Sequence, residues 1–213
     1  MTKPAEVPPK AASKYTLVDY LFQFITITAG VLIALLINGL VEWNHNRTLV
    51  ADARATIARE IAANKKDLDA TLASMDADVH RLESALRYAN DMLTKKSTSI
   101  NELNFHINLA DLSASGWRTA ERTGALGHMD YDEVQRLSLL YDLQDLIGEQ
   151  QRALIGQLSE VSSFLSSDFN PDNPNRRDLE VFRERLMRLR AALLIHQKLA
   201  TRLGENYAKA LQH

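Results

Sequence analysis

The longest apolar stretch of the chain lies near its N-terminus. From Tyr20 to Val41 there are 22 consecutive residues without a charged side chain. About 20 apolar residues, at a rise of ~1.5 Å each, cross the ~30 Å hydrocarbon core of a bilayer. Tyr15, Tyr20 and Trp43 lie near the two ends of the stretch, where aromatic rings prefer the headgroup region. The pattern predicts a membrane-spanning helix over residues 20–41.

Two other interpretations of this stretch are a buried helix of a soluble domain and a cleaved signal peptide. A helix of this length without a charge is unusual in a soluble core. A signal peptide has an apolar region of ~7–15 residues followed by an Ala-x-Ala-like cleavage site. The present run is longer and continues as Asn-Gly-Leu-Val-Glu-Trp (38–43) without such a site. We therefore expect the anchor to remain attached.

Polar and small residues within the predicted span follow a helical period. Gln23, Thr26, Gly30, Ala34 and Asn38 recur at steps of three or four residues and share one helix face. Two small residues four apart allow another backbone to approach, and each amide side chain can add ~0.5–2 kcal/mol through a hydrogen bond across the interface. We predict that this face contacts a second copy or another membrane helix. The alternative is that membrane helices simply tolerate these residues.

The apolar period continues after the span. No Gly or Pro occurs between Gly39 and Gly116, so we expect the membrane helix to continue into a long helix. Asn64 is the one interruption of its apolar stripe. The stripe consists of Val50, Ala53, Ile57, Ile61, Leu68, Leu72, Met75, Val79, Leu82, Leu86, Ala89 and Leu93.

The stretch 97–129 is less regular. We predict a short helix around Leu109, a second helix over Trp117 to Arg122, and turns at three glycines. These glycines are Gly116, Gly124 and Gly127. A new helix is expected to start at Asp130, with Glu133 completing a capping-box-like start.

Two further apolar stripes predict long helices in the second half of the chain. The first helix must end at the loop 168–175, which holds two Asn-Pro steps. Its stripe is Leu140, Leu143, Ile147, Leu154, Leu158, Val161 and Leu165. The last helix has the most regular heptad stripe, Leu179, Phe182, Leu186, Leu189, Leu193, His196, Ala200, Leu203 and Tyr207.

These patterns together predict an all-α protein. The N-terminal transmembrane helix is expected to continue into an elongated antiparallel bundle of three long helices plus short ones. The expected organisation is a polar flexible tail (1–19), the transmembrane helix (20–41) and the helical bundle domain (42–213).

Composition narrows the range of functions. The 25 basic and 27 acidic residues nearly balance, which argues against a nucleic-acid partner because nucleic-acid binders carry a basic face. The absence of cysteine excludes disulfides, thiolate zinc sites and cysteine nucleophiles. The expected partners are the lipid bilayer and, through the face of the span described above, a second copy of the chain or another membrane helix.

No motif predicts a catalytic residue, a metal site or a cofactor. The six histidines form no close-spaced ligand pair, and His196, on the last stripe, is expected to be a hydrogen-bonded core residue rather than a ligand or a pH switch. Asp168-x-Asn170-x-Asp172 imitates the start of a calcium loop. Asn173 replaces the required glycine and Leu179 the required glutamate, so this loop is expected to be only a turn.

The best candidate for a local site surrounds a tryptophan. Trp117, Arg118, Arg122 and His128 lie close together in a segment with three glycines. These residues could contact a partner or ligand from a loop. The favoured alternative is a cap, in which Trp117 closes one end of the bundle.

Two segments resemble a known family. Phe-Ile-Thr-Ile-Thr-Ala-Gly-Val-Leu-Ile-Ala-Leu-Leu-Ile-Asn (24–38), followed by Glu42-x-Asn44-x-x-Arg47, resembles the anchor of an uncharacterised family of small bacterial single-pass membrane proteins. Gly-Trp-Arg-Thr-Ala (116–120) and Leu-x-x-Leu-Tyr (137–141) resemble its second half, whereas Gly39 departs from its pattern. The resemblance implies a membrane-anchored helical protein and implies no activity.

The expected function is that of a non-enzymatic, membrane-anchored interaction or scaffolding protein. The alternative is a membrane-tethered small-ligand sensor or an accessory subunit of a membrane complex. The expected location is the bacterial inner membrane, with a single span. The short tail carries only lysines, Lys3, Lys10 and Lys14, which favours a cytoplasmic tail and a periplasmic bundle.

Overall fold

The computed structural model describes residues 17–94, 96, 103, 105–167, 169–170 and 173–212. They form the helices α1 (Leu17–Leu93), α2 (Ser115–Arg122), α3 (Tyr131–Ser167) and α4 (Arg176–Ala210), with a short 3-10 helix η1 (Ala125–His128). No strand occurs in these ranges, so the predicted all-α fold is confirmed. The chain divides into two compact units, residues 1–48 and residues 49–213, and α1 contributes to both.

The first unit contains the N-terminal part of α1. Every residue from Leu17 to His45 is exposed. The most apolar window of 18 residues has a mean hydropathy of 2.3 and none of it is buried. This helix is therefore long and apolar enough to cross a membrane. The prediction that it continues without a break into the following helix is confirmed, because α1 extends to Leu93.

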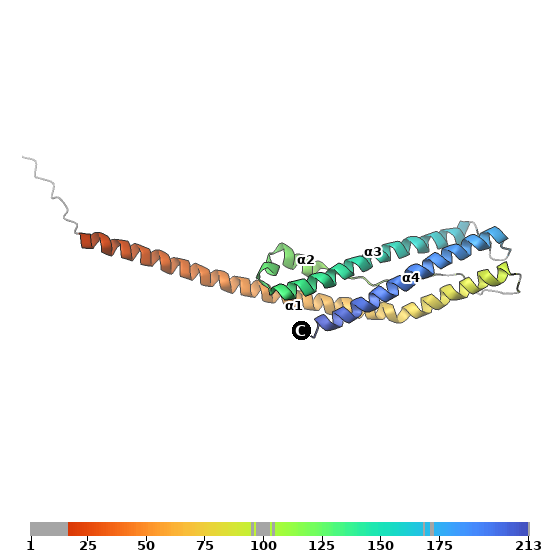
Figure 1. The fold of residues 1–213 in the computed structure, drawn as a ribbon, viewed down its shortest axis with the longest axis horizontal. Helices are drawn as coiled ribbons and strands as arrows, with labels where there is room; N and C mark the ends of the chain where they lie inside the picture. The colour runs from red at the N-terminus through yellow and green to blue at the C-terminus, as the bar shows by residue number, and fades with distance from the viewer. Residues whose placement is uncertain are drawn as a thin grey trace, which may run out of the picture. The chain divides into compact units, whose positions relative to one another are not determined.

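The second unit is a bundle of α3, α4 and the part of α1 that begins at Leu49 (Figure 1). Helix α4 is antiparallel to α1, because Gln197 hydrogen-bonds to Asp76 while the earlier Arg190 pairs with the later Glu83. Helices α3 and α4 follow one another through the loop that ends at Asn175, and they also pack side by side in opposite directions.

Helices α1 and α3 run parallel rather than antiparallel. On α1, Glu60 and Asn64 are hydrogen-bonded to Tyr141 and Gln144, respectively, of α3, so the numbering rises along both helices in the same direction. Two consecutive long helices can be parallel only if the connecting chain returns along the bundle. Residues 105–114, which we call the strap, make this return.

The strap corrects one prediction. It has no regular secondary structure, so the helix expected around Leu109 is wrong. Asn64 bonds to Ser113 at one end of the strap and Arg81 to His106 at the other. Between Asn64 and Arg81, α1 covers about 26 Å at helical rise, and residues 106–113 cover about 23 Å at the rise of extended chain. An extended chain therefore matches this length of α1 with half as many residues as a helix would need.

The hydrophobic core consists of two clusters. The first contains Ile57 and Leu68 of α1 with Leu203 of α4, and the second contains Leu82 of α1 with Phe182 of α4. Burial of each large apolar side chain stabilises the folded state by about 1.5–3 kcal/mol relative to leaving it exposed. All nine residues of the predicted α4 stripe are buried, which confirms the heptad assignment.

Helix boundaries differ from the prediction in detail. Gly116 was expected in a turn between helices but is the second residue of helix α2. Gly124 does lie in such a turn and has a positive φ of 77°. Asp130 caps α3 by accepting hydrogen bonds from the backbone N–H groups of residues 132 and 133. Glu133 does not complete a capping box, because its carboxylate pairs with Arg54. In the calcium-like loop, Asp168 and Asp172 lie outside the described residues.

Candidate functional site

The most densely bonded polar group of the bundle is the carboxylate of Glu60. Glu60 lies on α1 between the buried Ile57 and Ile61, and only 9% of its surface is exposed. An isolated buried carboxylate is strongly unfavourable, so its partners decide whether the fold tolerates it. These partners come from α2, from the strap and from α3.

Five donors surround the Glu60 carboxylate. Oε2 accepts hydrogen bonds from the backbone N–H of Gly116 at 2.7 Å, from Ser115 Oγ at 2.9 Å and from Ser113 Oγ at 3.0 Å. Oε1 accepts from the Tyr141 hydroxyl at 2.7 Å and from the backbone N–H of Trp117 at 3.4 Å. A carboxylate has about four lone-pair positions. The group is therefore saturated, and no oxygen is left for a substrate or a metal.

Glu60 also supplies the cap that α2 lacks in its own sequence. Ala114 occupies the N-cap position and makes no side-chain hydrogen bond to the helix. The free N–H groups of Gly116 and Trp117 instead donate to Glu60. Negative charge is favourable at a helix N-terminus. A residue 56 positions away thus fixes where α2 starts and where it docks.

These contacts determine the protonation of Glu60. Burial is the largest single influence and raises the pKa of its carboxyl. The hydrogen bonds from the Gly116 amide, Tyr141, Ser115 and Ser113 act in the opposite direction, and together they bring the pKa below its ordinary value. The same environment raises the pKa of the Tyr141 hydroxyl through burial and the nearby carboxylate. Glu60 is thus held ionised and Tyr141 neutral.

A second buried network lies one helical turn further along α1. Asn64 donates to the backbone carbonyl of Ser113 at 2.7 Å and to Gln144 Oε1 at 3.2 Å, and it accepts from the backbone N–H of Ser113 at 2.9 Å. Gln144 in turn donates to the Ser113 carbonyl and accepts from the Tyr207 hydroxyl at 2.5 Å. Amide side chains thus join α1, the strap, α3 and α4 at one level.

The remaining strap is held by further side chains. Asp67 accepts from the backbone N–H of Asp111 at 2.6 Å, and Gln151 of α3 donates to the Ala110 carbonyl at 3.0 Å. Arg81 donates to the His106 carbonyl at 3.3 Å. Because an extended segment forms no hydrogen bonds between its own backbone groups, polar side chains of α1 and α3 must satisfy them.

The hydrogen bonds of Glu60 and Asn64 position α2 and the strap against α1 and α3. The carboxylate is saturated, and the tyrosine hydroxyl that donates to it is held neutral. Among the described residues, no three His, Asp or Glu side chains are placed to hold a metal. The Glu60–Asn64 network is therefore a set of cross-links that fixes α2 and the strap on the bundle.

The predicted site around Trp117 is only partly brought together. Trp117 is half-buried against the first core cluster and stacks on Tyr141, with ring centroids 5.1 Å apart and planes 18° apart. Arg118, Arg122 and His128 are exposed. Arg118 lines a polar hollow of about 450 Å³ beside α3. The tryptophan thus packs against the bundle while the charged residues face solvent, and its closing of one end of the bundle stays a prediction.

The predicted helix–helix face of the span is fully exposed. Gln23, Thr26, Gly30, Ala34 and Asn38 are all accessible, and no heavy atom lies within 4 Å of the position that a Cβ on Gly30 would occupy. The Thr26 hydroxyl donates to the Phe22 carbonyl at 2.9 Å, which satisfies it within the helix. The face therefore stays available for another helix.

Two buried ionisable residues have side-chain atoms without a hydrogen-bond partner among the described residues, and one of them corrects a prediction. Both ring nitrogens of His196 are without a hydrogen-bond partner in the described part of the chain, so the expected hydrogen-bonded core histidine is wrong. Burial lowers its pKa. Asp78 pairs with Arg81 through Oδ1, whereas its Oδ2 has no hydrogen-bond partner in the described ranges. Burial raises its pKa, while Arg81, His106 and the Asn108 amide act in the opposite direction.

Sequence reasoning missed Glu60, Tyr141 and Gln144. The one signal was Asn64, a polar residue within an apolar stripe. Glu60 lies four residues before it and Thr71 seven residues after it, and both are buried as well. Glu60, Asn64 and Thr71 thus form a polar stripe at helical spacing along α1. This stripe could have indicated that a polar segment of the chain packs against α1.

No family model, curated protein or solved structure matches this chain.

Proposed function

We propose that this chain is a single-pass membrane protein whose bundle serves as an interaction or scaffolding module. Residues 20–41 would cross the bilayer, and residues 49–213 would form the module. The observation that carries the proposal is the complete exposure of the apolar residues 20–41, in a chain whose second unit has a buried core of its own. Contiguous apolar surface of this size on a soluble protein would drive aggregation unless a bilayer or partner covered it.

The bundle supports the scaffolding part of the proposal. Its side chains form two closed clusters, and its most buried carboxylate is saturated by structural donors. The cross-links from Glu60 and Asn64 hold α1, α2, α3 and α4 in one arrangement. A surface that must present the same contacts to a partner benefits from this kind of fixed geometry.

The anchor is tested by extraction of membranes with alkaline carbonate. Wild-type protein is expected in the membrane pellet. The double variant Ile33→Arg/Leu36→Arg is expected in the supernatant, because each arginine near the centre of a membrane helix costs about 2.5–3.5 kcal/mol of insertion free energy.

The matched control is Met187→Arg/Ile195→Arg. Met187 and Ile195 are 55% and 53% exposed, close to the 57% of Ile33. This variant adds the same charges to the bundle surface and is expected to stay in the pellet. Release of the wild-type chain by carbonate would contradict the anchor.

The interaction module is tested by crosslinking in intact membranes, followed by size measurement in detergent. We expect either a homo-oligomer or a reproducible crosslinked partner. A chain that is monomeric in detergent and crosslinks to nothing would contradict the scaffolding role, whatever the result for the anchor.

A further inference from the structure

Helices α3 and α4 share a side of the bundle that faces away from α1. On α4, Arg190 and Gln197 bond to α1 and mark the side that faces it. Successive residues of a helix are rotated by about 100°, so residues two positions apart are rotated by about 200°. Arg188 and Ile195 are two positions before the marking residues and therefore lie on the opposite side of α4.

Helix α3 is oriented in the same way. Gln144 bonds to α1 and Gln151 to the strap, so these two residues mark its inner side. Leu146 and Ala153 are two positions after them and lie on the opposite side of α3. Because α3 and α4 pack side by side, these residues form one surface with those of α4 (Figure 1).

We call this surface the outer face. Glu149 and Glu160 belong to it, because they are two positions before and nine positions after Gln151. Its residues are Leu146, Glu149, Ala153 and Glu160 of α3 and Arg188, Ile195 and Lys198 of α4. All of them are exposed, Leu146 by 42% and Ile195 by 53%. A partner that covered this face would remove its apolar side chains from water, which is favourable.

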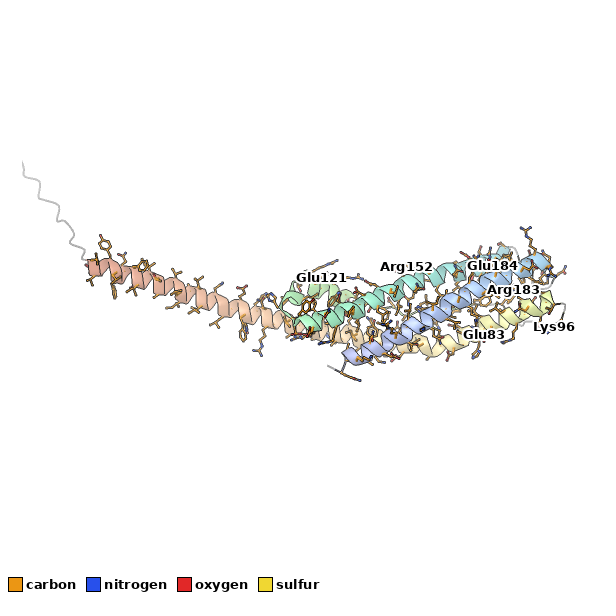
Figure 2. All side chains as sticks on the ribbon, viewed as in Figure 1. Glu83, Lys96, Glu121, Arg152, Arg183 and Glu184 are labelled. Carbon is orange, nitrogen blue, oxygen red and sulfur yellow. The ribbon has the colours of Figure 1, made fainter. Side chains whose placement is uncertain are left out.

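The charges of the outer face have opposite signs on its two helices. They are acidic on α3 and basic on α4, in keeping with the excess of acidic residues on α3 and of basic residues on α4. Within the described ranges, no ion pair joins a side chain of α3 to a side chain of α4. Arg188 pairs with Glu184 of its own helix, which Figure 2 labels, but an exposed pair of this kind contributes little. The opposite charges of the two helices thus remain available to a partner.

The acidic and basic residues lie at matching heights along the bundle. Tyr207 of α4 bonds to Gln144 of α3, and Arg185 of α4 bonds to the carbonyl of Glu160. Because the helices are antiparallel, residues at one height have numbers with nearly the same sum as these two pairs. By this rule Glu149 is level with Lys198. Glu160 is likewise level with Arg188, and Ala153 with Ile195.

This arrangement is complementary to a second copy of itself. A two-fold axis parallel to the helices places α3 of each copy against α4 of the other at the same height, so every contact occurs twice. Glu149 then meets Lys198 of the second copy. Glu160 meets Arg188 in the same way, and Ala153 meets Ile195 between the two charge pairs. A two-fold axis across the helices would instead place the acidic helices against each other and the basic helices against each other.

We infer that a second copy of the chain packs on the outer face, with α3 of each copy against α4 of the other. The inference rests on the proposed interaction module and names its partner. Complementary charges select the partner and its orientation, and the apolar residues between them supply close contact. Since the axis is parallel to the helices, the two bundles begin at the same end of the dimer.

Charge reversal tests this contact in the full chain in a non-ionic detergent. Every variant also carries Gly30→Ile, so that contact through the span is weakened. Glu149→Lys/Glu160→Lys and Arg188→Glu/Lys198→Glu should each weaken self-association by about tenfold or more, because like charges then meet in both contacts. An equimolar mixture of the two variants should associate as strongly as the parent, because opposite charges meet again. Analytical ultracentrifugation measures all of these proteins.

The matched control is Lys66→Glu/Arg183→Glu. It reverses two exposed basic residues outside the outer face, one on α1 and one on α4 (Figure 2). Arg183 is seven positions before Arg190 and so lies on the side of α4 towards α1. This variant should associate like the parent. The recovery expected in the mixture shows that the loss in each reversed variant is not a loss of fold.

Cysteine crosslinking tests the orientation, because the chain has no cysteine of its own. A chain with Ala153→Cys, mixed with a longer-tagged chain with Ile195→Cys, should form a disulfide-linked dimer on oxidation. The control mixes Ala153→Cys with Leu194→Cys, which is rotated by about 100° from Ile195 at the same height, and should crosslink much less. Ala153→Cys alone should also crosslink much less than the first mixture, because α3 does not meet α3.

Three results would overturn the inference. These are a mixture of the reversed variants that does not regain association, an equal loss in the Lys66→Glu/Arg183→Glu control, or equal crosslinking in the cysteine controls. Crosslinking of the chain in intact membranes separates the two proposals. A chain that crosslinks there but shows no recovery in the mixture contradicts only the contact between α3 and α4. A chain that is monomeric and crosslinks to nothing contradicts the interaction module as well.

Discussion

Glu60 and His196 show two opposite ways in which a polar residue is buried in this bundle. Glu60 receives five hydrogen bonds, whereas neither ring nitrogen of His196 has a partner among the described residues. A buried polar group costs free energy unless its hydrogen bonds are made. Substitution at the two positions should therefore change stability in opposite directions.

Glu60→Gln is expected to destabilise the bundle by about 2–4 kcal/mol, because it weakens charge-assisted bonds and sets an amide N–H₂ against existing donors. Urea unfolding of the full chain in detergent measures this change. The control Glu121→Gln, at an exposed position on α2 (Figure 2), should leave the unfolding midpoint nearly unchanged. Equal effects of both variants would show that the Glu60 network carries no stability.

The same residue contributes to the acid sensitivity of the fold. Because the pKa of Glu60 is lower in the folded chain than its ordinary value of 4.5, its contribution is complete above that pH. The contribution declines as the pH falls below 4.5 and is lost as the pH passes through the folded pKa. In urea unfolding over this range, Glu60→Gln should show a shallower loss of stability than wild type. Parallel curves would contradict the assignment.

His196→Leu is expected to stabilise the bundle by about 1 kcal/mol, because it replaces an unpartnered imidazole by an apolar side chain of similar volume. Burial lowers the pKa of His196 from 6.5, so wild-type stability should also fall as the pH drops below 6.5, where the unfolded chain takes up the proton. Thermal unfolding at several pH values measures both effects. A lower Tm for His196→Leu would indicate a partner for the ring.

At the scale of elements, α2 is positioned by contact rather than by its own sequence. A Cβ on Gly116 would lie 3.2 Å from Thr56 Cγ2 and 3.3 Å from Glu60 Oε1. Gly116 is therefore needed for the close approach of α2 to α1, not for a turn.

Gly116→Ala should cost about 1–3 kcal/mol, because the added methyl group displaces the carboxylate that caps α2. Gly127→Ala is the matched control, since no heavy atom lies within 4 Å of its Cβ position. Thermal unfolding of the two variants compares them directly. A similar Tm for both would mean that α2 does not dock on Glu60.

The strap depends on side chains that are distant in sequence. Asn64→Ala removes the acceptor for the Ser113 N–H and should raise hydrogen exchange of that amide by about tenfold or more, at 1.4 kcal/mol per factor of ten. Asp67→Asn keeps an acceptor oxygen for the backbone N–H of Asp111, so exchange of the Asp111 amide is expected to change much less. Unchanged exchange in Asn64→Ala would contradict the role of the amide in holding the strap.

At the scale of the whole molecule, association is expected to depend on the exposed helix that we propose as the anchor. Gly30→Ile should weaken self-association in detergent by about tenfold or more, because the branched side chain blocks close approach of a second helix. Gly39→Ile is the control, since nine residues along a helix place Gly39 on the opposite face. Analytical ultracentrifugation measures both variants. If neither changes, the span acts only as an anchor.

Local periodicity was sufficient to predict the helices. The apolar run over 20–41, the uninterrupted α1 and all nine buried positions of α4 follow from residue spacing alone. Spacing encodes these features because residues three and four apart lie on the same face of a helix, and an apolar face is the one that is buried. The prediction of a helix around Leu109 was wrong, because the backbone of this segment hydrogen-bonds to side chains of α1 and α3 instead of to itself.

Only the tertiary structure decided the polar interior. Glu60 is 53 to 81 residues away from the groups that donate hydrogen bonds to it. Its position along α1 places it next to the apolar stripe but does not identify those donors. The parallel course of α1 and α3 likewise depends on the strap, which is extended because Asn64, Asp67 and Gln151 satisfy its backbone. The sequence by itself thus determined which segments are helical and which faces are apolar, since those properties are local. The placement of α2 and the path of the strap depend on long-range hydrogen bonds, which exist only once the helices have packed. Packing also leaves the His196 ring without a hydrogen-bond partner among the described residues.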